Sequence, residues 1–230
     1  MENLNKYISG TTRGKLNQKV MNRIKIKLPF SNGKPDIKEQ ERLVNILEKA
    51  ETSKQKGKKA GDLLDKYLKS IFYEMFYNKG FEEVELGDKQ ICLTSGQYGS
   101  GASAVQYDKS KPRYIRITDI DEDGNLRNDP VSPSIIEKKY SLEKGDLLFA
   151  RSGATVGKTY LHTSKGDFQY AGYLIRFRFN SKILPEYAYF FTKTQRYLGW
   201  VSLVQRAVAQ PNINAKQYAS LKIPLPPLPL

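Results

Sequence analysis

The sequence has very little of the chemistry that most enzymes and metal sites require. Its 230 residues include one cysteine, Cys92, and one histidine, His162. A single cysteine cannot form a disulfide within the chain, and one cysteine with one histidine cannot complete a zinc site. Most catalytic schemes that depend on histidine are excluded for the same reason. We therefore predict that the chain has no catalytic residues and no metal ligands.

Long hydrophobic runs are absent as well. The uncharged apolar stretches are far shorter than the ~20 residues of a membrane-spanning helix, and residues 1–7 contain no apolar signal region. Hydrophobic residues still make up 39% of the sequence, which is enough to build a core. These features predict a cytoplasmic protein without a membrane partner.

Positive charge is what the sequence has in excess. Lys and Arg number 38 against 24 Asp and Glu, so the formal net charge is +14. This balance favours a polyanionic partner, either a nucleic acid or an anionic membrane surface. The alternative is a basic surface that only keeps the protein in solution.

The pattern of the chain changes twice, which divides it into three parts. Residues 1–36 are turn-rich and end in a short linker, residues 37–80 predict one long helix, and residues 81–230 predict a mixed domain of helices and strands. The predicted fold class is therefore α+β. A helix is expected from Pro185. Short apolar runs between turn-forming clusters predict strands at 81–86, 113–118, 146–150, 156–162 and 172–179. In the last of these, apolar side chains and arginines alternate, so they are predicted to point to opposite faces.

The long helix is predicted by a heptad repeat. Apolar side chains recur at alternating steps of four and three residues, which is typical of a coiled coil. The apolar positions of this seam are Leu43, Leu47, Leu64, Leu68, Ile71 and Met75. Asp36 is the predicted N-cap, with Glu39 three residues later. A single helix cannot bury its seam, so we expect a homodimer or pairing with a missing second half through this helix.

The end of the sequence repeats its beginning. Residues 8–29 match residues 205–226 at a constant offset of 197, with apolar positions aligned and Pro29 opposite Pro226. In residues 24–28, apolar side chains alternate with lysines, as on a half-buried strand. We therefore interpret residues 1–36 as the tail of a preceding domain, followed by a linker.

A glycine-rich turn at residues 151–159 invites comparison with a phosphate loop. That motif needs a glycine separated by four residues from Gly-Lys-Thr, and the position is occupied by Ser152. The residues that follow predict a strand, whereas a phosphate loop opens a helix. We therefore predict a tight basic turn, in which Arg151, Ser152 and Lys158 contact a phosphate backbone or a base edge.

Two other features favour structural roles. The acidic run at residues 119–123 precedes Gly124-Asn125 and lacks the ligand spacing of a calcium loop, so we interpret it as a hairpin turn. His162 is interpreted as a satisfied strand residue and not as a ligand.

Basic, amide and aromatic side chains recur through residues 81–230. Arg can pair two donors with guanine, and Asn and Gln can pair with adenine. Taken singly, each of these residues is more often a surface or core-rim residue, but as a set with the net charge they favour nucleic-acid binding. The candidate DNA-binding residues are Tyr98, Lys109, Arg113, Arg116, Arg151, Ser152, Lys158, Arg176, Arg178, Gln205, Arg206, Gln210 and Asn212.

Five segments in order resemble the specificity subunit of type I restriction-modification systems. They are F-x-x-V-x-L-G-D at 81–88, the glycine-rich segment from Ser95, Y-I-R-I-T-D-I at 114–120, L-x-K-G-D-L-L-F-A-R-S-G-A-T-V-G-K at 142–158, and Q-P-N-I-N leading to K-I-P-L-P-P-L-P at 210–229. A further segment, E-Q-x-R-L-V-x-I-L at 39–47, precedes them. This segment is similar to the start of that family's spacer helix. The resemblance extends over nearly the whole chain.

The resemblance implies a non-catalytic reader of double-stranded DNA. In this family, each target-recognition domain reads one half of a split site, and long helices pair antiparallel to fix the separation. It implies methyltransferase subunits as partners and, in the complete restriction complex, a translocating nuclease subunit. S-adenosylmethionine and ATP would belong to those partners. The chain departs from the family's usual plan, because it has one complete recognition domain and one spacer helix. The alternative function is a coiled-coil scaffold with a non-specific nucleic-acid-binding domain.

Overall fold

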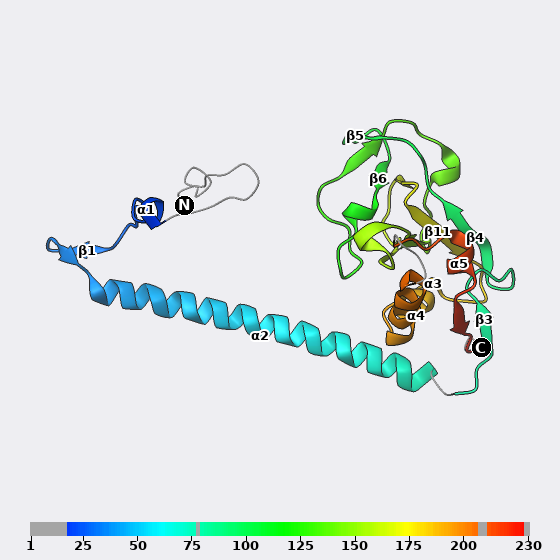
Figure 1. Ribbon diagram of the computed structural model, residues 1–230, viewed down its shortest axis with the longest axis horizontal. Helices are drawn as coiled ribbons and strands as arrows, with labels where there is room; N and C mark the ends of the chain where they lie inside the picture. The colour runs from blue at the N-terminus through cyan, green and yellow to red at the C-terminus, as the bar shows by residue number, and fades with distance from the viewer. Residues whose placement is uncertain (1–17, 77–78, 207–210, 228–230) are drawn as a thin grey trace. The chain divides into compact units, whose positions relative to one another are not determined.

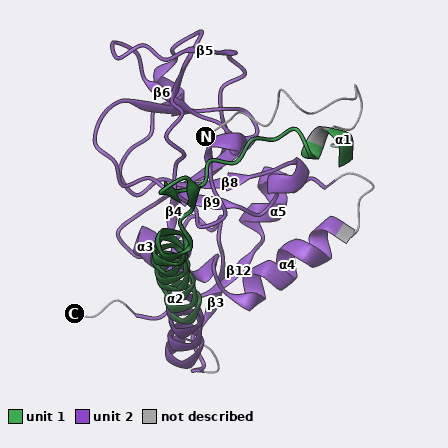
Figure 2. Ribbon diagram, turned by 90° about the vertical axis from the view of Figure 1, so that its left-hand side faces the viewer, with its two compact units in different colours: residues 1–63 green, residues 64–230 purple. Residues whose placement is uncertain are grey.

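The computed structural model describes residues 18–76, 79–206 and 211–227 (Figure 1). The chain divides into two compact units, residues 1–63 and residues 64–230 (Figure 2). One helix, α2 (Ile37–Phe76), passes from the first unit into the second. The chain therefore contains a long helix and a mixed domain, which confirms the predicted α+β class.

The first unit contains short elements ahead of α2. Helix α1 (Gln18–Met21) is a single turn, and β1 (Phe30–Ser31) pairs with β2 (Lys34–Pro35) in an antiparallel hairpin. Asn32 and Gly33 form its turn with φ of 51° and 73°, the left-handed conformation that such two-residue turns require. The expected strand at residues 24–28 is wrong, because among the described residues no strand pairs with it and Ile26 is 78% exposed.

Helix α2 begins at the predicted N-cap. The backbone N–H of Glu39 donates to Asp36 Oδ1 at 3.0 Å, which satisfies one of the unpaired amides of the first turn. At ~1.5 Å per residue, its 40 residues span about 60 Å. Most of the heptad seam is exposed in the single chain, as at Leu47 (67%) and Leu64 (62%). The seam thus offers a long apolar stripe that the described residues leave uncovered.

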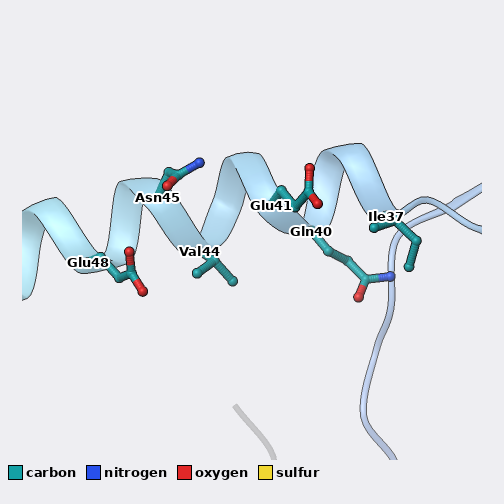
Figure 3. Close-up of a pocket in the computed structure, with 6 residues that line it drawn as sticks. All are labelled: Ile37, Gln40, Glu41, Val44, Asn45 and Glu48. Atoms are coloured by element: carbon teal, nitrogen blue, oxygen red, sulfur yellow. The ribbon is translucent and has the colours of Figure 1, made fainter.

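A shallow hollow follows another face of the first turns of α2 (Figure 3). Ile37 and Val44 supply its apolar surface and are 59% and 50% exposed. Its lining residues are Ile37, Gln40, Glu41, Val44, Asn45 and Glu48. All of them come from α2, so the hollow is an open surface and we assign no ligand to it.

The second unit is built on a four-stranded antiparallel sheet. Its strand order is β4 (Cys92–Tyr98), β11 (Leu174–Phe179), β8 (Leu147–Ala150) and β9 (Thr159–Leu161). Figure 2 shows the strands β5 and β6 at one end of this unit and β3 and β12 toward the other. The sheet therefore lies in the middle of the domain.

Three two-stranded ladders and three helices surround the sheet. The ladders pair β3 (Glu83–Glu85) with β12 (Lys222–Pro224), β5 (Ala104–Gln106) with β7 (Val131–Pro133), and β6 (Arg113–Ile115) with β10 (Phe168–Tyr170). The first two are antiparallel and the third is parallel. The helices are α3 (Pro185–Phe191), α4 (Gln195–Arg206) and α5 (Ala215–Ala219). Short 3₁₀ turns occupy Ile117–Asp119, Lys138–Tyr140 and Gly153–Thr155.

Both faces of the central sheet are covered. Successive side chains of a strand point to opposite faces, so Phe149 lies in a cluster with residues of the helices, while Leu148 lies in a second cluster on the other face. On β11, Ile175 and Phe177 join the first cluster. This confirms the predicted alternation of apolar residues and arginines along that strand. Because β8 is an inner strand and both faces of the sheet are covered, β8 is buried at every position.

The last turns of α2 pack into the domain core. Phe72 is 6% exposed, and its ring stacks on Tyr187 of α3 at 5.3 Å between centroids. Phe76 contacts the same ring edge-on at 4.9 Å. Neither phenylalanine belongs to the predicted seam, so the seam remains exposed while this end of the helix is fixed to the domain. Among the described residues, none of the helices has the length and apolar character of a membrane span.

Candidate nucleic-acid interface

The turn at residues 151–158 joins two antiparallel strands, as predicted. The backbone N–H of Gly157 donates to the carbonyl of Ala150 at 3.1 Å, and the N–H of Ala150 donates to the backbone carbonyl of Lys158 at 2.9 Å. These two bonds close the turn at its base. Gly153 and Gly157 have φ of 68° and 86°, which favours glycine at both positions. The strand β9 follows the turn, which excludes the strand-to-helix geometry of a phosphate loop.

Arg151, at the start of this turn, is held by two side chains from distant segments. Its guanidinium lies over the ring of Tyr98, with 4.8 Å from Cζ to the ring centroid. Its Nε donates to Asn212 Oδ1 at 3.4 Å. Among the described residues, its two Nη atoms make no hydrogen bond. The side chain is therefore positioned through its plane and its Nε, while no described residue uses its two outer nitrogens.

The backbone ties the same segments together. Ser152 and Asn212 form an isolated antiparallel bridge, and Ile213 N–H donates to the carbonyl of Arg151 at 2.8 Å. Tyr98 is fixed as well, because its hydroxyl accepts the N–H of Ala215 at 3.0 Å. Four residues of the predicted set, from three parts of the chain, thus lie at one end of the sheet, where β4 and β8 finish. We call Tyr98, Arg151, Ser152 and Asn212 the reader cluster.

Tyr173 extends this surface, although it was absent from the predicted set. It precedes β11 and is 61% exposed, and its carbonyl accepts the N–H of Arg151 at 3.0 Å. Tyr98 is 40% exposed. Arg151 therefore contacts two accessible tyrosines: its guanidinium lies over the ring of Tyr98, and its backbone N–H binds the carbonyl of Tyr173. An aromatic residue directly before a buried strand is the sequence signal that marks such a position.

Two buried tyrosines lie beneath the turn. Tyr218 of α5 donates its hydroxyl to the carbonyl of Ala150 at 2.8 Å, and Tyr197 of α4 donates to the carbonyl of Gly157 at 2.8 Å. Both side chains are completely buried. Burial raises the pKa of Tyr197 well above its usual value, and the neighbouring Tyr218 adds to this effect. Sequence analysis did not identify this pair, because the two carbonyls come from the backbone of another element.

Lys158, at the end of the turn, is already paired. Its Nζ lies 2.7 Å from Glu122 Oε1, and the lysine side chain is 16% exposed whereas that of the glutamate is 83% exposed. Glu122 belongs to the acidic run, which forms the predicted turn. The backbone N–H of Asp121 closes this turn by donating to the backbone carbonyl of Asn125 at 2.9 Å. Tyr189 holds this turn by donating its hydroxyl to the carbonyl of Asp123 at 3.1 Å.

Arg176 and Arg178 lie apart from the reader cluster. Arg178 makes a two-pronged contact with Asp146, at 2.7 Å from Nε and 2.8 Å from Nη2, and these bonds raise its pKa. Arg176 is 5% exposed and donates to the carbonyl of Ser141 at 2.8 Å and to Gln97 Oε1. These partners hold both guanidiniums against the domain, although Arg176 Nε is buried and makes no hydrogen bond among the described residues. The contacts stabilise the fold, and we leave both residues out of the proposed surface.

The other predicted residues are dispersed. Arg116 pairs with Asp119 at 2.7 Å, and this hydrogen bond raises the pKa of Arg116. Arg113 donates to the carbonyl of Arg127, and Lys109 lies exposed in the segment after β5. The remaining three are Gln205, half-buried near the end of α4, Arg206, whose side chain is outside the described residues, and Gln210, which is wholly outside them.

The single histidine and cysteine are both buried. His162 is 1% exposed, its Nδ1 lies 3.1 Å from the hydroxyl of Tyr160, and burial lowers its pKa. This confirms its interpretation as a satisfied residue beside a strand. Burial raises the pKa of Cys92 to about 12. Across residues 18–76, 79–206 and 211–227, no cluster of three or more His, Cys, Asp or Glu side chains is arranged to hold a metal ion.

Solved structures with this fold include two from type I restriction-modification systems. A chain described under complex assembly and conformational transition of the type I R-M system is 19% identical, with a TM-score of 0.52, and the match covers 84% of this chain and 49% of that one. The type I restriction-modification system S subunit from M. genitalium is 17% identical, with a TM-score of 0.54, and the match covers 95% of this chain and 56% of that one. The chain therefore spans about half the length of these proteins. No curated protein matches the sequence.

The family is defined by the sequence of the domain itself. Residues 78–229 match the family described as the type I restriction modification DNA specificity domain. The match includes the central sheet, the basic turn and all four residues of the reader cluster. It covers well over half of the chain, and the solved structures share the fold. The chain belongs to the type I restriction-modification DNA specificity family.

Proposed function

We propose that this chain binds double-stranded DNA sequence-specifically and reads one half of a bipartite target for a type I restriction-modification system. The observation that carries the proposal is the reader cluster, in which Arg151 is stacked on Tyr98 and held by Asn212, with its outer donors unused by the described residues. A guanidinium fixed in its plane is suited to two parallel hydrogen bonds with one guanine edge. Fixing it before binding reduces the entropy lost in the complex.

The charge of the domain supports a DNA partner. Residues 81–230 contain 20 basic and 15 acidic residues, an excess of five. Several basic side chains, including Arg176 and Arg178, are neutralised within the fold, so the free positive charge belongs to the surface. Phosphate contacts from that surface would supply affinity, and the reader cluster would supply the preference for one base sequence.

We propose that catalysis belongs to partner subunits. The family implies methyltransferase subunits that dock on this chain, and a nuclease subunit in the restriction complex. S-adenosylmethionine and ATP would be bound by those subunits. The chain's own part would be to bind and orient the DNA so that the target base reaches the methyltransferase. The purified chain alone is expected to transfer no methyl group from S-adenosylmethionine to DNA.

The exposed seam of α2 supports pairing with another helix. A stripe that includes Leu47, Leu64 and Leu68, each more than half exposed, is costly to leave in water. A second copy of the chain, or a second half-subunit, would cover it. Residues 1–36 fit this proposal as the tail of a preceding domain, because α1 lies at the same offset of 197 from α5 as the sequence repeat.

A salt titration tests the DNA-binding proposal. Fluorescence anisotropy of a labelled duplex should report binding whose affinity falls about a thousandfold between about 50 and 200 mM salt, if roughly six phosphates are contacted. The affinity for single-stranded RNA of the same length should be lower. Binding that is absent, or that does not respond to salt, contradicts the proposal and favours a scaffold function.

A further inference from the structure

The turn that presents Arg151 is fixed at both ends by phenol hydroxyls from different helices. Tyr218 donates to the carbonyl of Ala150, directly before Arg151, and Tyr197 donates to the carbonyl of Gly157, at the far end. Each bond is 2.8 Å long, and both rings are completely buried. The two helices thereby control the position of the turn from inside the core.

Tyr197 and Tyr218 also share two aromatic neighbours, Phe149 and Trp200. The ring of Phe149, the residue before Ala150, lies 4.8 Å from that of Tyr218 and 6.3 Å from that of Tyr197. Trp200 of α4 contacts both tyrosines, at 5.7 Å and 6.2 Å. The rings therefore form one aromatic cluster. Replacing a hydroxyl by hydrogen should leave this packing in place and remove only the bond to the turn.

Helix α4 fits closely against the same turn. A Cβ added at Gly157 would lie 2.8 Å from Cγ1 of Val201, so the backbone approaches the helix too closely for any side chain. At Gly153, on the outer part of the turn, such a Cβ would meet nothing within 4 Å among the described residues. The turn thus has one end fixed against α4 and an outer part that the described residues leave open.

We propose that Tyr197 and Tyr218 are positioning residues for sequence recognition, which hold the turn at residues 151–157 so that Arg151 meets a base edge in register. The proposal rests on the proposed function. Base contacts demand that donors and acceptors align, whereas phosphate contacts tolerate a shifted or mobile loop. Loss of either hydroxyl should therefore weaken discrimination between sequences and leave general DNA affinity unchanged.

The test uses the full chain with Tyr197→Phe, Tyr218→Phe and the control Tyr187→Phe. Tyr187 donates its hydroxyl to the carbonyl of Pro224, so the control removes the same kind of bond at another place. The probes are a duplex selected by the wild-type chain from a randomised library and an unrelated duplex of equal length. We expect the preference for the selected duplex to fall about tenfold in both turn variants, with affinity for the unrelated duplex unchanged. The control should keep the wild-type preference.

Amide hydrogen exchange without DNA gives a second readout that does not depend on the proposed function. The amides of residues 151–157 should exchange faster in the two turn variants and at the wild-type rate in the control. Unchanged exchange, or an equal loss of preference in the control, overturns the positioning role. Faster exchange with full preference shows that the turn does not read the DNA. If the wild-type chain has no preference, the proposed function fails, and exchange alone decides whether the tyrosines fix the turn.

Discussion

The guanidinium of Arg151 lies over the ring of Tyr98, and each is fixed by a different residue of the segment that leads into α5. Asn212 accepts from Arg151, and Ala215 donates its N–H to the hydroxyl of Tyr98. A cation over an aromatic face contributes about 0.5–1 kcal/mol at an exposed site. The pair is thus oriented in the free protein, as the proposed contact with a base requires.

Arg151→Lys separates shape from charge. Lysine keeps the positive charge but loses the planar pair of donors and the flat contact with Tyr98. A good bidentate contact provides about 1–3 kcal/mol of base discrimination. We therefore expect the preference for the selected duplex to fall by about tenfold to a hundredfold, while affinity for an unrelated duplex is nearly retained. Competition binding measures both quantities.

Lys182→Ala is the matched control for that change. Lys182 is exposed beyond the other end of β11, away from the reader cluster. Its loss should weaken binding to both duplexes slightly and equally. A wild-type preference in Arg151→Lys would show that Arg151 contacts phosphate and not a base.

Glu122→Gln should free Lys158 for a phosphate. The exposed carboxylate holds the lysine at 2.7 Å in the free protein, so a DNA phosphate that binds Lys158 would have to displace it. Without that carboxylate, the slope of the logarithm of the binding constant against the logarithm of the salt concentration should become steeper, by the amount expected for about one more phosphate contact. Glu186→Gln removes the same charge from the exposed first turn of α3, where the described residues show no ion pair. Equal salt slopes in the two variants would contradict a contact by Lys158.

Asp146→Asn should destabilise the domain. Asp146 is 1% exposed and pairs with Arg176 and Arg178, so its loss leaves the buried Arg176 without the carboxylate that neutralises it, and leaves Arg178 with the exposed Glu143. Breaking a buried ion pair costs about 3–5 kcal/mol of unfolding free energy. Urea denaturation measures the change. Glu143→Gln also removes a partner of Arg178, but its side chain is 70% exposed, so we expect less than about 1 kcal/mol. Comparable losses would contradict the central role of Asp146.

His162 predicts a loss of stability at acid pH. Burial lowers its pKa below the ordinary 6.5, an effect that the charge of Asp146 partly opposes, and its ring faces the hydroxyl of Tyr160. The unfolded chain takes up a proton more readily than the folded one. The contribution of His162 to the free energy of unfolding is therefore complete above about pH 6.5, and it is lost as the pH falls below that value. Urea unfolding should show a steeper decline from about pH 7 to 5 in the wild type than in His162→Gln. Parallel curves would contradict this account.

Local patterns predicted much of the fold. The heptad repeat and Asp36 identified α2 and its start, and the alternation of apolar residues with arginines identified the two faces of β11. The helix expected from Pro185 proved to be two, because the chain turns between Phe191 and Gln195. Strand β4 was missed, since Ser95 and Gly96 interrupt its apolar pattern.

The candidate site was predictable only in part, because it depends on contacts between distant segments. The sequence identified Arg151 and Asn212 as residue types suited to DNA, and the fold brings them together. Arg176 has the same side chain as Arg151, but it is buried beside Asp146. Single-sequence patterns cannot separate these two arginines, because the difference lies in which carboxylate or ring the fold places beside each one.

Selection from a randomised duplex library is the most direct test of the central claim. The full chain should enrich a short specific consensus, and Arg151→Ala should lose a base position within it and leave the others. If α2 pairs two copies of the chain, the consensus should be split and palindromic, because a two-fold axis relates the two domains. Uniform recovery of all sequences by the wild-type chain, at a salt concentration where it binds DNA, would contradict the account.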